Sequence, residues 1–126
     1  MNEKLNDLAR QIHNQNKSKG FYDDPKNIGE MIALMHSELS EALEADRLDS
    51  YCTLDVQALS LLDSESKQGF RFGYATYVKG TFEEEMADTL IRILDMCAFK
   101  GIDIESHIKL KMKWNSMRKH KHGKRY

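Results

Sequence analysis

The sequence contains little proline and little cysteine, and it has no long hydrophobic run. One proline among 126 residues leaves few enforced interruptions of helices. The two cysteines, Cys52 and Cys97, form neither a CxxC pair nor a zinc-binding spacing, so we expect reduced thiols. No segment approaches the ~18 consecutive apolar residues of a membrane span, and the first residues lack the apolar stretch of a signal peptide. These absences argue against a disulfide-rich, zinc-binding or membrane-spanning protein and predict a cytoplasmic one.

The composition is that of an ordinary globular domain. Hydrophobic residues make up 40% of the chain and charged residues 31%, with a formal net charge of −1. A length of 126 residues favours a single domain spanning 1–126. The charge is uneven, because the last 18 residues contain eight Lys or Arg and no acid. Such a tail suits DNA, RNA or a membrane surface, but also an anionic ligand onto which it folds back.

Helical spacing of apolar residues predicts four main helices, at about 3–17, 25–47, 81–99 and 104–119. Asp24 and Asp103 are the expected N-caps of the second and fourth helices, and Thr81 with Glu84 fits a capping box before the third. The segment at about 49–80 is an irregular insert, with a possible short helix at 53–63 and a hairpin or ordered loop at 69–80. Long helices joined by short links predict an all-α fold, a four- to five-helix bundle.

Two pairs of acidic residues stand out on these helices. Glu38 and Glu41 lie within "SELSEAL", at the margin of an apolar stripe centred near Met35 and Leu39. Glu85 and Asp88 repeat the three-residue spacing in "EEEMADTL". Residues three apart are neighbours on a helix, so each pair presents two carboxylates on one surface. If the pairs face each other, their oxygen ligands suit a hard cation, Mg²⁺ or Mn²⁺. Two solvated helix faces are the alternative, and spacing alone leaves the choice open.

The fourth helix adds a polar stripe of Lys111, Asn115 and Arg118, spaced i, i+4, i+7 and flanked by apolar residues on both sides. Cations and an amide opposite four carboxylates make sense if phosphate and metal lie between them. The alternative is a basic helix whose long side chains cover apolar neighbours.

With these segments taken together, the chain resembles the MazG-like all-α nucleoside triphosphate pyrophosphohydrolases, relatives of the dimeric dUTPases and dCTP pyrophosphatases. The resemblance rests on "SELSEALE", "EEEMADTLIRILD" and "KMKWN", with "LARQIH" and "GFYDD" at suitable distances, and covers roughly 5–48 and 81–126. It implies hydrolysis of a (d)NTP to (d)NMP and pyrophosphate by attack of water on the α-phosphorus. It also implies a homodimer or homotetramer that completes the bundle.

The resemblance also implies roles for individual residues. Glu38, Glu41, Glu85 and Asp88 would bind Mg²⁺, for which Mn²⁺ is a possible substitute, and Glu41 would orient or deprotonate the attacking water. The substrate-binding residues would be His13 and Tyr22 at the base and Lys111, Asn115 and Arg118 at the phosphates and sugar. Tyr22 departs from the tryptophan expected there, which affects base specificity more than chemistry.

Two other classes of function compete with this interpretation. One is a nucleic-acid-binding protein that uses the basic C-terminal tail, which predicts salt-dependent affinity and no metal requirement. Nucleic acid is not the partner we expect, because that account gives the acids no role. The other is a helical oligomer that has kept the fold without activity.

Overall fold

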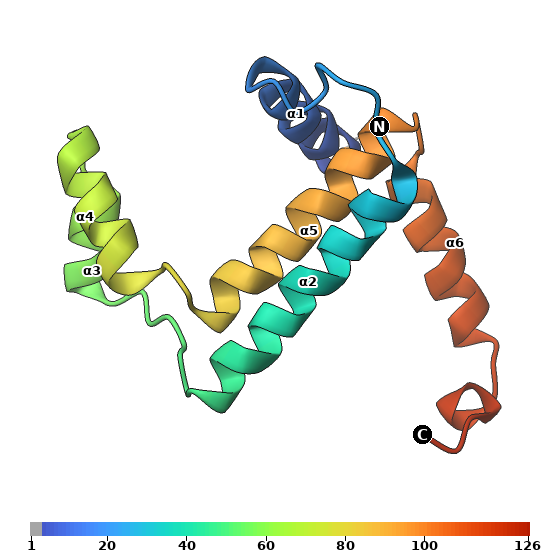
Figure 1. Cartoon of the computed structure of the whole chain (residues 1–126). Coiled ribbons are helices and arrows are strands. Elements are labelled where there is room, and N and C mark those ends of the chain that lie inside the picture. Colours follow the sequence, from blue (N-terminus) through green and yellow to red (C-terminus); the bar gives the residue numbers. More distant parts are fainter. Residues whose placement is uncertain (1–3) are drawn as a thin grey trace. The chain divides into compact units, whose positions relative to one another are not determined.

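The structure is a computed structural model that describes residues 4–126. In this part of the chain it contains six α-helices, a short 3₁₀ helix and no strand, which confirms the prediction of an all-α fold. The helices are α1 (Lys4–Ser18), α2 (Ile28–Arg47), α3 (Val56–Leu62), α4 (Lys67–Tyr77), α5 (Phe82–Phe99) and α6 (Ile104–Ser116), followed by η1 (His120–Gly123) (Figure 1). Closure of the helices into a four- to five-helix bundle by oligomerisation stays a prediction.

Side-chain caps fix where most of these helices begin. Asp103 accepts a hydrogen bond from the backbone N–H of Ser106 at 3.1 Å, which confirms it as the cap of α6. For α2 the expected start was wrong, because Asn27 caps the helix by accepting the Glu30 N–H at 3.0 Å. Asp24 and Pro25 therefore precede the helix. Asn27 is in extended conformation directly before Ile28, and its side chain satisfies one of the free N–H groups of the first turn, so the helix begins at Ile28.

The chain divides into two compact units, which are described separately. One contains the chain up to Pro25 together with Ile93–Tyr126, and the other contains Lys26–Arg92. Helix α5 belongs to both. The prediction of a single domain stays a prediction.

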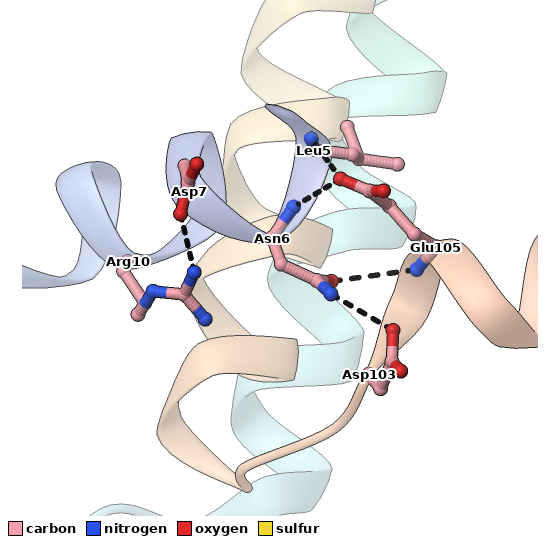
Figure 2. Close-up of polar contacts among 6 residues, drawn as sticks. All are labelled: Leu5, Asn6, Asp7, Arg10, Asp103 and Glu105. Carbon is pink, nitrogen blue, oxygen red and sulfur yellow. Dashed lines mark hydrogen bonds and ion pairs between the residues drawn. The ribbon is translucent and has the colours of Figure 1, made fainter. Parts of the chain in front are cut away.

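In the first unit, the beginning of α1 is tied to the beginning of α6 (Figure 2). The Glu105 carboxylate accepts hydrogen bonds from the backbone N–H groups of Leu5 and Asn6, the latter at 2.9 Å. The buried Asn6 side chain donates to Asp103 at 2.8 Å and accepts from the Glu105 N–H at 3.4 Å. Three backbone N–H groups at the two helix starts, those of Leu5, Asn6 and Glu105, thus donate to a side chain of the opposite helix, because they have no partner within their own helix.

In the second unit, α2 lies alongside the first part of α5, and the hairpin of α3 and α4 extends from their ends (Figure 1). Two contacts anchor the connecting segments to the start of α5. The Phe82 N–H donates to the Ser50 carbonyl at 2.9 Å, and the Tyr51 and Phe82 rings stack with their centroids 5.2 Å apart. The segment expected to be an irregular insert at about 49–80 contains α3 and α4, so it is mostly helical.

Helix α4 corrects the expectation of a hairpin or loop at 69–80. Ser66 caps it by accepting the Gly69 N–H at 3.2 Å. Gly73 is buried, and a Cβ placed there would lie 2.8 Å from Leu61 Cβ, so its lack of a side chain lets α4 approach α3 closely. Gly69, Gly73 and Tyr77 follow a four-residue period. That helical signal was hidden, because two of the three residues carry no side chain.

Few large side chains contribute to the interior. Among residues 4–126 no large side chain is fully buried, and the buried apolar residues are Ala9, Ala42, Ala45, Ala58, Leu94 and Cys97. Large apolar side chains are exposed on most helices, for example Leu43 on α2 (50%), Leu90 on α5 (58%) and Trp114 on α6 (60%). No helix of the described chain is long and apolar enough to cross a membrane.

Candidate metal centre

The acidic pair on α2 occupies the inner side of that helix. Residues 38, 42 and 45 are buried and Met31 and Met35 are half-buried, so the inward stripe has the spacing 31, 35, 38, 42, 45. Glu38 lies in the middle of this stripe and is 8% exposed. The expectation that Glu38 lies beside an apolar stripe centred on Met35 and Leu39 was wrong. Leu39 is 46% exposed, while the small Ala42 and Ala45 give the neighbouring helix room.

Glu38, Glu41 and Glu85 come together in the second unit. Each offers one carboxylate oxygen, and these three oxygens all lie within 4.8 Å of one another. Glu85 Oε2 is buried, and no N–H or hydroxyl group of the described residues donates a hydrogen bond to it. A buried carboxylate oxygen is normally paired, because desolvating it without a partner is costly. This unpaired atom is the feature that distinguishes the cluster from a solvated acidic face.

Arg92 on α5 forms the one ion pair that these acids have within residues 4–126. Its Nε–H donates to Glu38 Oε1 at 2.9 Å. One guanidinium therefore stands against several carboxylates, and their mutual repulsion shows in their pKa values.

Each of the three glutamates changes the pKa of the others. Burial, hydrogen bonding with Glu38 and the charge of Glu41 raise the pKa of Glu85 to about 7. Hydrogen bonding with Glu38 and the charge of Glu38 raise the pKa of Glu41. Burial alone would raise the pKa of Glu38, but hydrogen bonds from Glu41, Arg92 and Glu85 together lower it. Without a cation the cluster therefore holds a proton near neutral pH, and that proton is what a metal ion would displace.

Asp88 lies near the three glutamates but outside the tight group. Burial and then the charges of Glu38 and Glu84 raise its pKa, while Arg92 opposes the shift. Its carboxylate is thus close enough to feel Glu38. Of the four acids predicted to bind metal, Glu38, Glu41 and Glu85 therefore form a tight group, and Asp88 lies beside them.

His13 and Tyr22, in the first unit, share a buried partner. Asp95 is 8% exposed and lies 2.9 Å from His13 Nδ1, and it accepts a hydrogen bond from the Tyr22 hydroxyl at 2.6 Å. Burial and this hydrogen bond raise the pKa of Tyr22. The rings of His13 and Tyr22 meet edge to face at 4.6 Å, and Phe99 lies 5.0 Å from Tyr22. Asp95 therefore fixes the orientation of both predicted base-contacting side chains.

The polar stripe predicted for the fourth helix is only partly inward, and Arg118 lies beyond α6, which ends at Ser116 and not at about 119 as expected. Lys111 is exposed, whereas Asn115 and Arg118 are half-buried. Asn115 Oδ1 is buried without a hydrogen-bond partner among residues 4–126, and Arg118 Nη2 donates to the His122 carbonyl at 3.0 Å. These residues belong to the first unit and the carboxylates to the second.

Sequence reasoning assigned no role to Arg92 or Asp95, although both contact predicted site residues. They share the side of α5 that carries Glu85 and Asp88, at four and seven residues after Asp88. That side lies opposite the apolar face of the helix, and the sequence alone identifies no partner there for either residue. An arginine one turn after an acidic pair is the signal that was present, because it places a cation beside the carboxylates.

No known protein family, curated protein or solved structure matches the chain. The resemblance to MazG-like enzymes therefore stays a prediction.

Proposed function

We propose that this protein is a Mg²⁺-dependent nucleoside triphosphate pyrophosphohydrolase that converts a (d)NTP to (d)NMP and pyrophosphate. The observation that carries the proposal is the group of three carboxylate oxygens within 4.8 Å, one of whose side chains keeps a buried, unpaired oxygen. Four acids and one arginine give this part of the second unit a surplus of negative charge. Such an arrangement is stable at neutral pH only with a proton or a cation.

The donor set fits a hard divalent cation. All the candidate ligands are carboxylate oxygens, and none is a thiolate or imidazole, which suits Mg²⁺ or Mn²⁺ and offers little to Zn²⁺. Glu38 and Glu85 are the inner ligands, because both side chains are largely removed from solvent. Asp88 is the fourth acid and lies one turn beyond Glu85 on α5.

Bound Mg²⁺ would supply charge neutralisation for the triphosphate and acidify a water molecule. The chain's own contribution is to hold the carboxylates and to accept a proton. Glu41 is suited to the second task, because it is the exposed member of the three glutamates and can be reached by water.

The nucleotide contacts follow the resemblance and the local geometry of the first unit. His13 and Tyr22 would contact the base, held in place by Asp95. Lys111, Asn115 and Arg118 would contact phosphate and sugar. The unpaired Asn115 Oδ1 supports a ligand contact there, since a buried amide oxygen without a partner is costly.

A second copy of the chain is the expected partner, as a homodimer or homotetramer. Support comes from the exposed apolar residues of the helices that carry the acids, Ile32, Leu39 and Leu43 on α2 and Met86 and Leu90 on α5. Apolar side chains in such numbers usually mark an interface. Analytical ultracentrifugation across a range of concentrations tests this, and a monomer throughout would refute it.

The proposed activity is tested by incubating the protein with each common NTP and dNTP, with and without Mg²⁺. We expect pyrophosphate and a nucleoside monophosphate as products, only with Mg²⁺. Glu38→Gln should lose activity, because it removes the most buried carboxylate of the cluster. Glu44→Gln is the matched control, since Glu44 lies on the same helix but pairs with Arg47 at the surface.

Three results would contradict the proposal. Release of single phosphates would indicate a different reaction, and full activity of Glu38→Gln would exclude the carboxylate cluster. No turnover of any nucleotide, combined with salt-dependent binding of DNA or RNA, would favour a nucleic-acid-binding protein that uses the basic tail.

A further inference from the structure

Arg92 has a geometry that a simple counter-ion does not require. Its contact with Glu38 uses the Nε–H alone, at 2.9 Å, and Glu38 is the one hydrogen-bond partner that Arg92 has within the described chain. The guanidinium is planar and carries five N–H donors in a fixed fork. Anchoring through Nε leaves the two terminal nitrogens, with four N–H donors between them, available on the outer edge of the group.

The accessibility of the pair is asymmetric. The Glu38 side chain is 10% exposed, whereas the Arg92 side chain is 39% exposed. The carboxylate end is therefore held inside the second unit, and the arginine can be reached from solvent. A ligand that approaches the carboxylates would meet Arg92 beside them.

Charge identifies the kind of ligand. Before a cation binds, Arg92 offsets part of the negative charge of Glu38 and of the neighbouring Asp88. Once a divalent cation occupies the carboxylates, a guanidinium next to it is repelled, because two positive groups then lie within a few ångström. An anion in contact with both removes that repulsion. The outer edge of a guanidinium binds two oxygens of a phosphate in parallel hydrogen bonds.

We propose that Arg92 is a phosphate-binding residue of the carboxylate site. Glu38 fixes its Nε, and its terminal nitrogens bind non-bridging oxygens of a di- or triphosphate. The assignment rests on the proposed function, since it requires a divalent cation at Glu38, Glu41 and Glu85. Arg92 would contact both the polyphosphate and the metal ligand Glu38. Binding of the anion would therefore also hold the Glu38 side chain in position.

The experiment measures two affinities without any turnover. Mn²⁺ is titrated alone, monitored by electron paramagnetic resonance, and inorganic pyrophosphate is titrated by calorimetry in saturating Mn²⁺. The variants are Arg92→Met, which keeps the apolar stem, and Arg92→Lys, which keeps the charge but loses the fork. Arg47→Met is the matched control, because Arg47 forms a surface pair with Glu44 at 3.6 Å on α2.

Arg92→Met should weaken pyrophosphate binding by about tenfold to a hundredfold, the usual effect of losing charge-assisted hydrogen bonds. Its affinity for Mn²⁺ alone should stay equal to that of the wild type or increase, since a competing cation has been removed. Arg92→Lys should give an intermediate loss, and it carries the test if Arg92→Met fails to fold. Arg47→Met should change neither affinity.

Each contrary result has a distinct meaning. Unchanged pyrophosphate affinity in both Arg92 variants would overturn the assignment and leave the proposed function intact. Parallel loss of Mn²⁺ and pyrophosphate binding would show that Arg92 only holds Glu38 in place. If the wild type binds no Mn²⁺, the proposed function fails, and the assignment fails with it.

Discussion

Replacing Glu85 with glutamine should stabilise the metal-free protein above neutral pH. Glutamine has nearly the same shape as glutamate but carries no charge, so it removes one member of the repelling cluster. Its amide can also donate a hydrogen bond to Glu38 or Glu41, which a carboxylate cannot do. Most substitutions of partly buried residues destabilise a protein, so a gain in stability is a distinctive expectation.

The magnitude follows from the pKa of Glu85, which is raised from its ordinary value of 4.5 to about 7. A group whose pKa is higher in the folded state stabilises folding while it is protonated, and that contribution is lost as the pH rises from 4.5 through about 7. The full shift corresponds to about 3 kcal/mol at about 1.4 kcal/mol for each pH unit. Glu85 is partly exposed, and solvent screening reduces the expected gain to about 1–2 kcal/mol.

Magnesium should reverse the order of stability. A ligand that binds only the folded state stabilises it by about 2.7 kcal/mol at a concentration one hundred times its dissociation constant. The wild type gains this stabilisation, whereas Glu85→Gln has lost a metal ligand and gains little. The variant should therefore be the more stable protein in EDTA and the less stable one in saturating Mg²⁺.

The assay is urea unfolding followed by circular dichroism, in EDTA and in saturating Mg²⁺, above pH 7 and below pH 4.5. Below pH 4.5 the wild type and Glu85→Gln should be equally stable, because the carboxyl group is then protonated. Glu44→Gln should behave as the wild type throughout. A variant less stable than the wild type above pH 7 in EDTA would refute the reasoning. Equal stabilisation of both proteins by Mg²⁺ would also refute it.

Two further predictions concern other parts of the chain. Asp95→Asn removes the anionic acceptor of His13 and Tyr22, so it should cost about 1–3 kcal/mol in urea unfolding. It should also lower the pKa of Tyr22 towards its ordinary value, measured by ultraviolet titration, and an unchanged tyrosine titration would contradict this. Gly73→Ala places a Cβ 2.8 Å from Leu61 Cβ and should cost about 1–3 kcal/mol. A variant as stable as the wild type would mean that α3 and α4 separate without cost.

The sequence predicted the long helices well, because their local signals agree with one another. Asp103 is followed by a helical apolar pattern, and Gly101 adopts a positive φ of 68° just after α5 ends. Caps and terminators act within a few residues of themselves, so they can be recognised without knowing the tertiary structure. The start of α2 was predicted wrongly because Asp24 and Asn27 are both favourable N-cap residues. Only the backbone geometry shows that Asn27 is the cap.

The inward sides of α2 and α5 could not be predicted from hydrophobicity. The apolar spacing placed Leu39 at the centre of the inward stripe of α2, yet it is 46% exposed. On α5, the large apolar Leu90 is 58% exposed. The interior is instead lined by Ala42, Ala45 and the acidic residues, of which Glu38 is buried. The rule that apolar residues face the interior fails where charged groups of two helices meet. It considers each residue alone, although a partner on the other helix can offset the cost of burying a charge.

The pairing of acids by sequence spacing did identify three residues that the structure brings together, Glu38, Glu41 and Glu85. The partners of the site residues were harder to identify. Arg92 contacts Glu38 across 54 positions of sequence, and Asp95 contacts His13 across 82. A charge on a helix surface looks the same in sequence whether it faces water or an acid on another helix. Only the packing of the two helices against each other distinguishes these two cases.

The position of the carboxylates links stability to ligand binding. Glu38 takes a place on α2 where a large apolar residue would otherwise stabilise the contact with α5, and its neighbours Ala42 and Ala45 contribute little buried area. The second unit therefore lacks part of the hydrophobic stabilisation that its length allows. A cation at the three carboxylates would replace that stabilisation with electrostatic attraction, and a polyphosphate on Arg92 would add to it. The metal-free form should accordingly be the least stable state of the protein, with each ligand raising the free energy of unfolding in turn.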